Sequence, residues 1–203
     1  HYTVTGGTGL LVISGTGSIA FGINQKEKMG RVGGWAFSIM GEEGSGTWVN
    51  RKALRYLANC YDKVAREGLL ADLIKEKLEI NTAKDLADYS AFLMKHKNGT
   101  TSLGEIVDYA AEHGDENAVR ILKDAARETV KLADNLIQVL EMQRDSQIVI
   151  GIWGSNIVQS KIHSGEFEHL IKEKYPQAVV RRPKDEAVEG AARMARELYE
   201  NRE

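Results

Sequence analysis

Short apolar runs separated by polar turns mark the first part of the chain. Residues 9 to 33 contain the apolar run "LLVIS", the partly alternating run "SIAFGIN", the polar stretch "QKEK" and the segment "MGRVGG". Runs of this length, bounded by Gly, Asn and charged residues, are typical of strands joined by tight turns. The pattern therefore predicts a β-meander at the start of the chain.

Apolar positions repeat with helical spacing from about residue 45 to about residue 143. The longest helix is predicted from about Asp115 to Met142, because one side of that segment is apolar throughout. Thr82 with Asp85, and Ser102 with Glu105, have the spacing of a capping box and predict two further helix starts. The first helix has its predicted buried stripe at Val49, Ala53, Leu57, Cys60 and Val64.

Strands and helices alternate near the end of the chain. "SQIVIGIWG" and "AVVRRP" predict two strands, with helices beginning at Ser155 and running from Asp185 to about Tyr199. Gly190 lies within the last helix, where glycine costs roughly 1 kcal/mol relative to alanine. We expect close packing there, against a sheet or against a ligand. The sequence shows no repeat or linker and predicts a single α/β domain over residues 1–203, with a helical block over about 45–143.

Composition and charge exclude several classes of protein. The 203 residues are 42% hydrophobic, which is ordinary for a soluble globular domain. The 27 basic and 29 acidic residues are mixed along the chain, without the basic stripe that binding to nucleic acid requires. No apolar stretch reaches the roughly 18 residues of a membrane span. We expect a cytoplasmic protein with neither nucleic acid nor membrane among its partners.

The chain has a single cysteine, Cys60. An internal disulfide framework and an all-cysteine metal site are therefore excluded, which fits a reducing compartment. Cys60 belongs to the predicted buried stripe, which favours a small buried side chain over a reactive thiol. The sequence begins with His1 rather than Met, and an apolar strand follows almost at once. We expect the sequence to be part of a larger protein.

The segment "ISGTGSIAFG", residues 13–22, is a candidate phosphate-binding turn. A Walker loop is excluded because the chain contains no Gly-Lys pair, and a dinucleotide fingerprint is excluded because Gly15-Thr16-Gly17-Ser18 precedes a strand rather than a helix. What remains is a tight turn whose glycines let backbone N–H groups face an anion, and whose hydroxyls, Thr16 and Ser18, donate to its oxygens. A plain hairpin turn has the same pattern, so both interpretations stay open.

A second candidate site lies in residues 30–46, where six glycines surround a few apolar residues. Trp35 is either a core anchor or the flat platform against which a sugar ring packs. Glu42 or Glu43 accepts hydrogen bonds from sugar hydroxyls, or both are solvated. Phe37, Ile39 and Met40 are predicted to be apolar anchors of the loop. Loops of this kind often hold binding sites.

A third candidate is "IVIGIWGSN", a strand that leads through Gly154 and Ser155 into a helix. In α/β folds this arrangement places a bound nucleotide at the end of a strand.

The three loops in this order resemble those of the BadF/BadG/BcrA/BcrD-type ATPases and their N-acetylglucosamine kinase relatives. The resemblance covers nearly the whole chain and includes "AAEHGDENAVRIL" at residues 110–122 and "EGAARMA" near Gly190. It implies the actin-like, ribonuclease H-like fold of two lobes with ATP between them. This chain then corresponds to the C-terminal lobe, with a helical insertion and with the N-terminal lobe absent.

The resemblance also implies a set of binding residues. Thr16 and Gly17 would face the ATP phosphates, Ser18 would lie between phosphate and sugar, and Glu42 would replace the sugar-binding aspartate of the family. The implied ATP-binding residues are Gly15, Thr16, Gly17, Ser18, Ala111, Gly114, Gly154 and Ser155. The implied sugar-binding residues are Ser18, Gly34, Trp35, Glu42 and Glu43.

The sequence departs from the family pattern at two of the loops. The usual D-E-G-S-G is E-E-G-S-G from Glu42 onward, which lengthens the acidic arm, and one extra residue separates Trp35 from Gly41. The identity of the sugar is left open by these changes. Gly154-Ser155 stands where many members have Gly-Gly, as in the animal-type N-acetylglucosamine kinases. The family's first phosphate loop and its proton-accepting aspartate precede this sequence, so no catalytic base is assigned here.

The leading hypothesis is an ATP-dependent kinase for N-acetylglucosamine or a close amino sugar, using ATP and Mg²⁺. The isolated chain is expected to be inactive, because phosphoryl transfer needs both lobes around the metal. A homodimer is a further possibility for the parent protein. One alternative is a sugar- or nucleotide-sensing module. Another is the activator ATPase of an acyl-CoA dehydratase or reductase, which requires two cysteines per subunit for its iron–sulfur cluster.

Overall fold

A mixed sheet forms the centre of the computed structural model, which describes residues 1–35, 41–96, 102–183 and 187–200. Within these residues the sheet has five strands, in the order β3-β2-β1-β4-β5. The strands are β1 (Gly9–Ser14), β2 (Ser18–Ile23), β3 (Met29–Gly33), β4 (Ile148–Trp153) and β5 (Ala178–Arg181). The first three form the predicted meander, and the last two are the predicted C-terminal strands.

Strand direction brings two turns to the same edge of the sheet. β1 and β2 are antiparallel, and their last pair, Ser14 opposite Ser18, closes the hairpin. β4 lies parallel to β1, with Trp153 opposite Ile13, so the two strands end side by side. The hairpin turn and the turn after Trp153 therefore emerge at one edge, although more than a hundred residues separate them.

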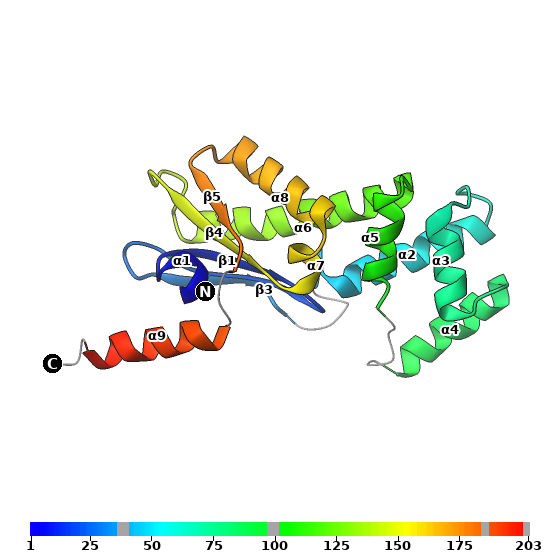
Figure 1. Cartoon of the computed structure of the whole chain (residues 1–203), viewed down its shortest axis with the longest axis horizontal. Helices are drawn as coiled ribbons and strands as arrows, with labels where there is room; N and C mark the ends of the chain where they lie inside the picture. Colours follow the sequence, from blue (N-terminus) through cyan, green and yellow to red (C-terminus); the bar gives the residue numbers. More distant parts are fainter. Residues whose placement is uncertain (36–40, 97–101, 184–186, 201–203) are drawn as a thin grey trace.

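Helices cover both faces of the sheet (Figure 1). The long α6 (Glu116–Val139) and α8 (Lys161–Lys174) lie on one face, and the short α1 (Tyr2–Thr5) and α9 (Ala187–Glu200) lie on the other. Gly190 of α9 packs on α1, since a Cβ on Gly190 would come within 2.5 Å of Thr3 Cγ2. The expected close packing at Gly190 is present in the structure, and its partner is another helix rather than the sheet.

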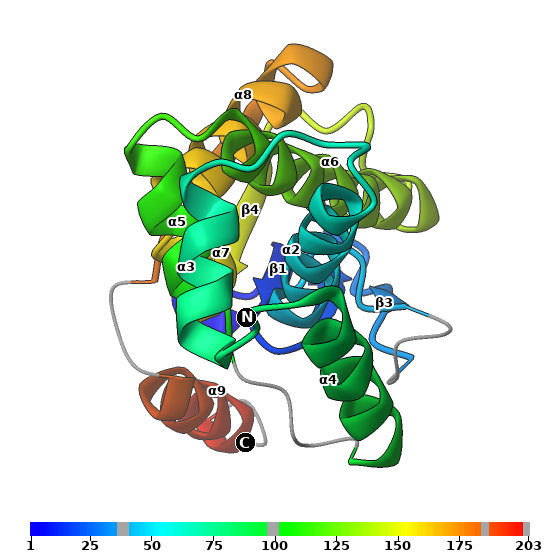
Figure 2. The same ribbon diagram turned by 90° about the vertical axis from the view of Figure 1, so that its right-hand side faces the viewer.

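Helices α2 to α5 form a second region, here called the helical extension, which projects beyond the sheet (Figures 1 and 2). They are α2 (Gly46–Tyr61), α3 (Leu69–Leu78), α4 (Ala83–Lys95) and α5 (Gly104–Glu112). Their apolar faces meet in a core of their own around Leu57, Leu70 and Val107, all fully buried. Cys60 is buried in this core, as predicted.

The long helix α6 belongs to both regions. Its N-terminal part contributes Ala118, Leu122 and Ala125 to the core of the helical extension. Its C-terminal part contributes residues from Ala126 to Leu136 and beyond to the core over the sheet. At 1.5 Å per residue a helix of this length reaches about 36 Å, enough to cross both regions. The predicted helical block is thus not a separate unit, because half of α6 covers the sheet.

One of the two predicted capping boxes is confirmed and the other is wrong. Thr82 and Asp85 bind each other's backbone N–H groups at the start of α4. Helix α5 instead begins after Leu103, whose side chain caps nothing. Leu103 is buried, and its N–H donates to Asn50 Oδ1 of α2 at 2.9 Å. A tertiary contact, rather than Ser102 and Glu105, fixes this helix start.

Two predicted helix ends are also wrong. Helix α2 ends at Tyr61, and the turn after it leaves Val64 78% exposed rather than in the buried stripe. Helix α6 ends at Val139, before the predicted Met142, because Glu141 adopts a left-handed backbone conformation with φ 59°. Met142 is nevertheless buried, so the apolar pattern correctly predicted its burial but not the end of the helix.

Candidate functional site

The hairpin loop, residues 15–17, connects β1 to β2 at the sheet edge. Gly15 N–H donates to the Gly17 carbonyl at 2.9 Å, which closes the turn. Thr16 is exposed at its tip. Within the described part of the chain, the N–H groups of Thr16 and Gly17 and the Thr16 hydroxyl make no hydrogen bond. Three hydrogen-bond donors of this loop therefore have no partner among the described residues.

Helix α2 determines which way these donors point. Gly46 N–H donates to the Gly15 carbonyl at 2.7 Å, and Thr47 donates to the Thr16 carbonyl from its N–H and from its hydroxyl, at 3.3 and 2.8 Å. In a planar trans peptide the carbonyl and the following N–H point in opposite directions. Because both carbonyls face the N-terminus of α2, the N–H groups of Thr16 and Gly17 both point away from it.

The acidic loop, residues 41–45, is held to the hairpin through Ser18. Ser18 N–H donates to Glu42 Oε2 at 2.6 Å, and Ser18 Oγ donates to the Glu43 carbonyl at 2.8 Å. Ser18 is 4% exposed, so both of its donors are used inside the protein. The ligand contact expected of Ser18 stays a prediction, and the structure gives this residue an internal role that the sequence did not indicate.

Glu42 needs an unusual backbone and a glycine opposite it. Its φ is 73°, in the left-handed region that non-glycine residues rarely adopt. A Cβ on Gly17 would overlap the Glu42 carboxylate, so a side chain there would displace Glu42 from its bond to Ser18. Glu42 is half-buried and keeps one carboxylate oxygen outside the bond to Ser18, whereas Glu43 is exposed.

Trp35 directly follows Gly34, which is hydrogen-bonded to Ser18. Gly34 N–H donates to the Ser18 carbonyl at 3.0 Å, and a Cβ on Gly41 would lie 3.8 Å from the Trp35 Cβ, so Gly41 is close to Trp35. Trp35 is 61% exposed, which rules out the core-anchor interpretation. The Arg31 guanidinium lies 4.6 Å from the centre of its indole ring. The predicted anchors Phe37, Ile39 and Met40 lie outside the described residues.

The Gly154 turn, residues 154–156, completes this edge. Gly154 has φ 97°, and a Cβ there would overlap the Ser14 carbonyl. β4 therefore passes into the short α7 (Ser155–Val158) directly against the end of β1. The Ser155 side chain is exposed beside it. The structure thus brings together three predicted loops, the hairpin loop, the acidic loop and the Gly154 turn.

Asn156 joins these loops and was not predicted. Its Nδ2 donates to Ser14 Oγ at 2.8 Å and to the Gly44 carbonyl at 3.0 Å. Ser14 Oγ in turn donates to the same Gly44 carbonyl at 2.8 Å. A polar residue directly after Gly154-Ser155 was the available signal in the sequence. Its partners are more than a hundred residues away, and no local pattern reveals them.

His163 is a second residue that the sequence analysis missed. It lies in the first turn of α8, is fully buried, and contacts Thr129 of α6 and Asn156. Burial lowers the pKa of His163 to about 4, so its imidazole is neutral near neutral pH. A buried histidine on a helix has no distinguishing sequence pattern, because the groups it contacts are far away along the chain.

The turn between α5 and α6 is not part of the same cluster. Asp115 caps α6 through Asn117 and Ala118, and its other oxygen accepts from Leu70 N–H at 2.9 Å. Ala111 is buried in the core of the helical extension, and Gly114 faces open space. No hydrogen bond within the described residues joins Ala111 or Gly114 to the hairpin loop. Their predicted place beside the adenosine stays a prediction.

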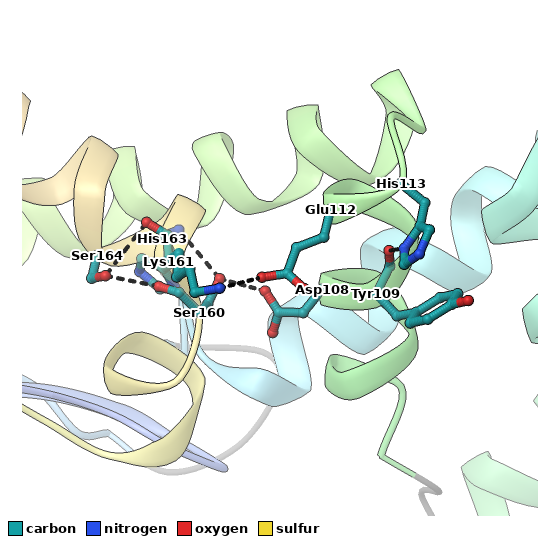
Figure 3. A network of polar contacts seen from close by, with 8 residues as sticks. All are labelled: Asp108, Tyr109, Glu112, His113, Ser160, Lys161, His163 and Ser164. Carbon is teal, nitrogen blue, oxygen red and sulfur yellow. Dashed lines mark hydrogen bonds and ion pairs between the residues drawn. The ribbon is translucent and has the colours of Figure 1, made fainter.

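Helix α5 contacts the start of α8, which follows the Gly154 turn and α7 in the chain (Figure 3). Ser160 Oγ donates to Asp108 Oδ1, and Lys161 pairs with Glu112 at 3.1 Å. Burial raises the pKa of the Asp108 carboxyl, against the opposing effect of the Ser160 hydrogen bond. These contacts fix the helical extension against α8 at a point close to the site.

Metal and thiol chemistry find no support among the described side chains. No three His, Cys, Asp or Glu residues in that part of the chain converge as ligands would. Burial raises the pKa of the Cys60 thiol, which favours the unreactive form. Within these 203 residues the single Cys60 cannot supply the two cysteines per subunit that an activator's cluster requires. In the described helices none is long and apolar enough to cross a membrane.

The fold and the position of the three loops define the class of protein, a lobe of the actin-like ATPase fold that sugar kinases share. A candidate N-acetylglucosamine kinase from Chromobacterium violaceum superposes with a TM-score of 0.71 at 18% identity, over 94% of this chain and 60% of that one. A hexokinase structure superposes with a TM-score of 0.53 at 15% identity, over 88% of this chain and 47% of that one. Both show the fold that was predicted.

The chain belongs to the BadF/BadG/BcrA/BcrD ATPase family, whose sequence model matches residues 2–195. It is 33% identical to an N-acetylmuramic acid/N-acetylglucosamine kinase of Clostridium acetobutylicum, over 93% of this chain and 61% of the relative. It is 30% identical to an N-acetyl-D-glucosamine kinase of Dictyostelium discoideum, over 92% of this chain and 59% of the relative. The chain thus spans about three fifths of the length of these two relatives.

Proposed function

We propose that this chain forms the nucleotide- and sugar-binding lobe of an ATP-dependent kinase for an amino sugar of the N-acetylglucosamine type. The observation that carries the proposal is the hairpin loop, where the Thr16 and Gly17 N–H groups point the same way and the Thr16 hydroxyl lies beside them. Adjacent backbone N–H groups that face one side bind anions. Terminal phosphate oxygens of ATP are the anion that the family relationship favours.

The sugar is proposed to bind between Trp35 and Glu42. The exposed indole offers an apolar face for a pyranose ring, and the free oxygen of Glu42 accepts a hydrogen bond from a hydroxyl. Gly34 and Glu43 border this place, and Ser18 lies behind it. The names of the two curated relatives support an N-acetylated amino sugar as the substrate class.

The adenosine part is proposed to lie along the Gly154 turn. Gly154 and the exposed Ser155 are next to the hairpin loop, so a nucleotide whose phosphates meet Thr16 can extend past them. Ala111 and Gly114 are proposed to form the far border of the adenosine pocket. Gly114, with φ 87° and open space around it, leaves room there for a ligand.

The described residues contain no group of three or more His, Cys, Asp or Glu side chains that could hold a metal ion, and Mg²⁺ usually binds through one or two carboxylates together with substrate phosphates. The metal is proposed to arrive with ATP, held by phosphate oxygens. The role of this chain in phosphoryl transfer is then to position the phosphates and the acceptor hydroxyl, and not to exchange a proton with the sugar. A proton acceptor is not assigned within these residues.

Binding, rather than turnover, tests this proposal, since the chain spans only part of the relatives' length. Amide chemical shifts would be followed while MgADP, and separately N-acetylglucosamine, is added. MgADP is expected to shift Gly15 to Ser18 together with Gly154 and Ser155, and the sugar is expected to shift Trp35 and Glu42.

Two controls make the binding test specific. Thr16→Val removes one donor but keeps the shape of the exposed side chain, and it is expected to weaken MgADP binding roughly fivefold. Val64→Thr, at an exposed position in the turn after α2, is expected to leave binding unchanged. Shifts that avoid the three loops, or a Thr16→Val variant that binds MgADP as the wild type does, would contradict the proposal.

A further inference from the structure

His163 is a buried residue of α8 that contacts both α6 and the Gly154 turn. Its ring is fully buried between α6 and the Gly154 turn. Its Nε2 is 3.1 Å from Thr129 Oγ1, and its Nδ1 is 3.5 Å from Asn156 Nδ2. Figure 3 shows it in the first turn of α8, next to the contacts that α8 makes with α5.

The hydrogen-bond pattern assigns one tautomer to this ring. Thr129 Oγ1 donates its only proton to the Ala126 carbonyl at 2.9 Å, so it accepts from His163 Nε2–H. Nδ1 then has a lone pair, which faces the amide group of Asn156. The Nε2–H form agrees with the Thr129 contact, and a hydrogen bond with the Asn156 backbone also acts on the ring, opposing the effect of burial on the pKa of His163.

The Asn156 side-chain amide links His163 to the hairpin loop and the acidic loop. Its Nδ2 lies 2.8 Å from Ser14 Oγ, 3.0 Å from the Gly44 carbonyl and 3.5 Å from His163 Nδ1. Ser14 directly precedes the hairpin loop, and Gly44 belongs to the acidic loop. Gly44 also rests on α6, since a Cβ there would come within 2.6 Å of the Ala125 carbonyl. Rotation of the Asn156 amide would release contacts to both loops at once.

We infer that His163 is a positioning residue that, by orienting the Asn156 amide, sets the hairpin loop and the acidic loop against the Gly154 turn. It does not touch the nucleotide itself. The effect on ligand affinity rests on the proposed function, whereas the effect on the hairpin loop does not. Loss of the Nδ1 acceptor is therefore expected to loosen the hairpin loop and weaken nucleotide binding, even where the fold is retained.

Two substitutions separate this role from packing. His163→Asn keeps an acceptor near the position of Nδ1 and loses the donor to Thr129. His163→Gln keeps a donor near the position of Nε2 and leaves Asn156 without its partner. Both remove the same buried ring, so both are expected to lower thermal stability by a similar amount. Ser164→Ala, which removes a buried hydroxyl one residue further along α8, serves as the control for a lost hydrogen bond.

Two measurements are made on each variant. MgADP affinity is measured by calorimetry, and hydrogen exchange is measured without ligand at the Gly46 amide, which donates to the Gly15 carbonyl. His163→Gln is expected to bind MgADP roughly tenfold more weakly and to exchange Gly46 faster. His163→Asn and Ser164→Ala are expected to stay within about twofold of the wild type in both measurements.

Each outcome has a separate meaning. Equal effects of His163→Asn and His163→Gln would show that the ring only fills space, which overturns the inference. A wild type that does not bind MgADP, together with faster Gly46 exchange in His163→Gln alone, would overturn the proposed function and leave the positioning role standing. If neither histidine variant folds, the half-buried Asn156→Ala takes their place, and unchanged Gly46 exchange in that variant overturns the inference.

Discussion

The hairpin end of the sheet and the helical extension hold their shape by different means. At the hairpin end, a side chain on Gly44 or Gly154 would overlap the backbone of a neighbouring segment, so close backbone approach positions these loops. The helical extension depends instead on buried side chains such as Leu57 and on caps such as Asp115. The loops of the site therefore depend on glycines that allow close approach and on polar side chains such as Ser18 and Asn156, whereas the extension depends on buried apolar side chains.

This difference has a functional reason. Loops that approach each other through glycine leave backbone N–H groups available for a ligand, as at Thr16 and Gly17. Helices satisfy their backbone groups internally, so they contribute stability and position rather than binding groups. The two regions are nevertheless coupled, because α6 supplies residues to both cores.

The largest expected effect comes from removing a large buried side chain in either region. Leu57→Ala in the helical extension and Leu136→Ala in the sheet core are each expected to lower the free energy of unfolding by about 2–5 kcal/mol, because both side chains are fully buried. Urea unfolding followed by circular dichroism and by tryptophan fluorescence should give one shared transition. Two separate transitions would show that α6 does not couple the regions.

Acidification is expected to have the next largest effect, and it acts through His163. Its pKa is about 4 in the folded protein and about 6.5 in the unfolded chain, so the unfolded state binds more protons between these values. The stabilising contribution is complete above pH 6.5 and is lost as the pH falls toward 4, by up to about 3 kcal/mol. Stability measured against pH for wild type and His163→Asn isolates this contribution from that of Asp108, because only the wild type has the histidine.

A pair of glycine substitutions sharpens the comparison between the regions. Gly154→Ala at the sheet edge is expected to cost about 2–3 kcal/mol and to abolish MgADP binding, because its Cβ would overlap the Ser14 carbonyl and its φ is 97°. Gly114→Ala at the edge of the helical extension has a similar φ of 87° but open space around it. Its cost is expected to be only about 1 kcal/mol, from backbone strain alone. If both variants lose the same stability in thermal unfolding, the close approach of Gly154 to Ser14 is not the cause of the loss at Gly154.

The smallest effect on stability is expected at Trp35. Since its side chain is 61% exposed, Trp35→Ala should change the free energy of unfolding by less than about 0.5 kcal/mol. The same variant is expected to lower N-acetylglucosamine affinity roughly tenfold, because the sugar loses its apolar platform. Met94→Ala, at an 82% exposed position of α4, is the control and should affect neither quantity. Unchanged sugar binding in Trp35→Ala would remove the tryptophan from the proposed sugar site.

The sequence by itself determined the features that depend on neighbouring residues. Strand runs, the capping box at Thr82 and the turn at Gly15 to Gly17 were predicted because local spacing and backbone freedom are local properties. The family resemblance added the fold and brought Gly154 and Trp35 into one hypothesis. Local patterns failed at Ser102 and Val64, where contacts from elsewhere in the chain, or their lack, decide the conformation.

Only the tertiary structure decided how the loops fit together. Ser18 holds the acidic loop, Asn156 bridges two loops, and His163 orients Asn156 from a helix that no motif singled out. These contacts join residues far apart in the chain, and side-chain chemistry alone does not show which of many possible partners meet. The sheet brings them together because β1 and β4 are parallel and end at the same edge, so distant turns share one place in the fold.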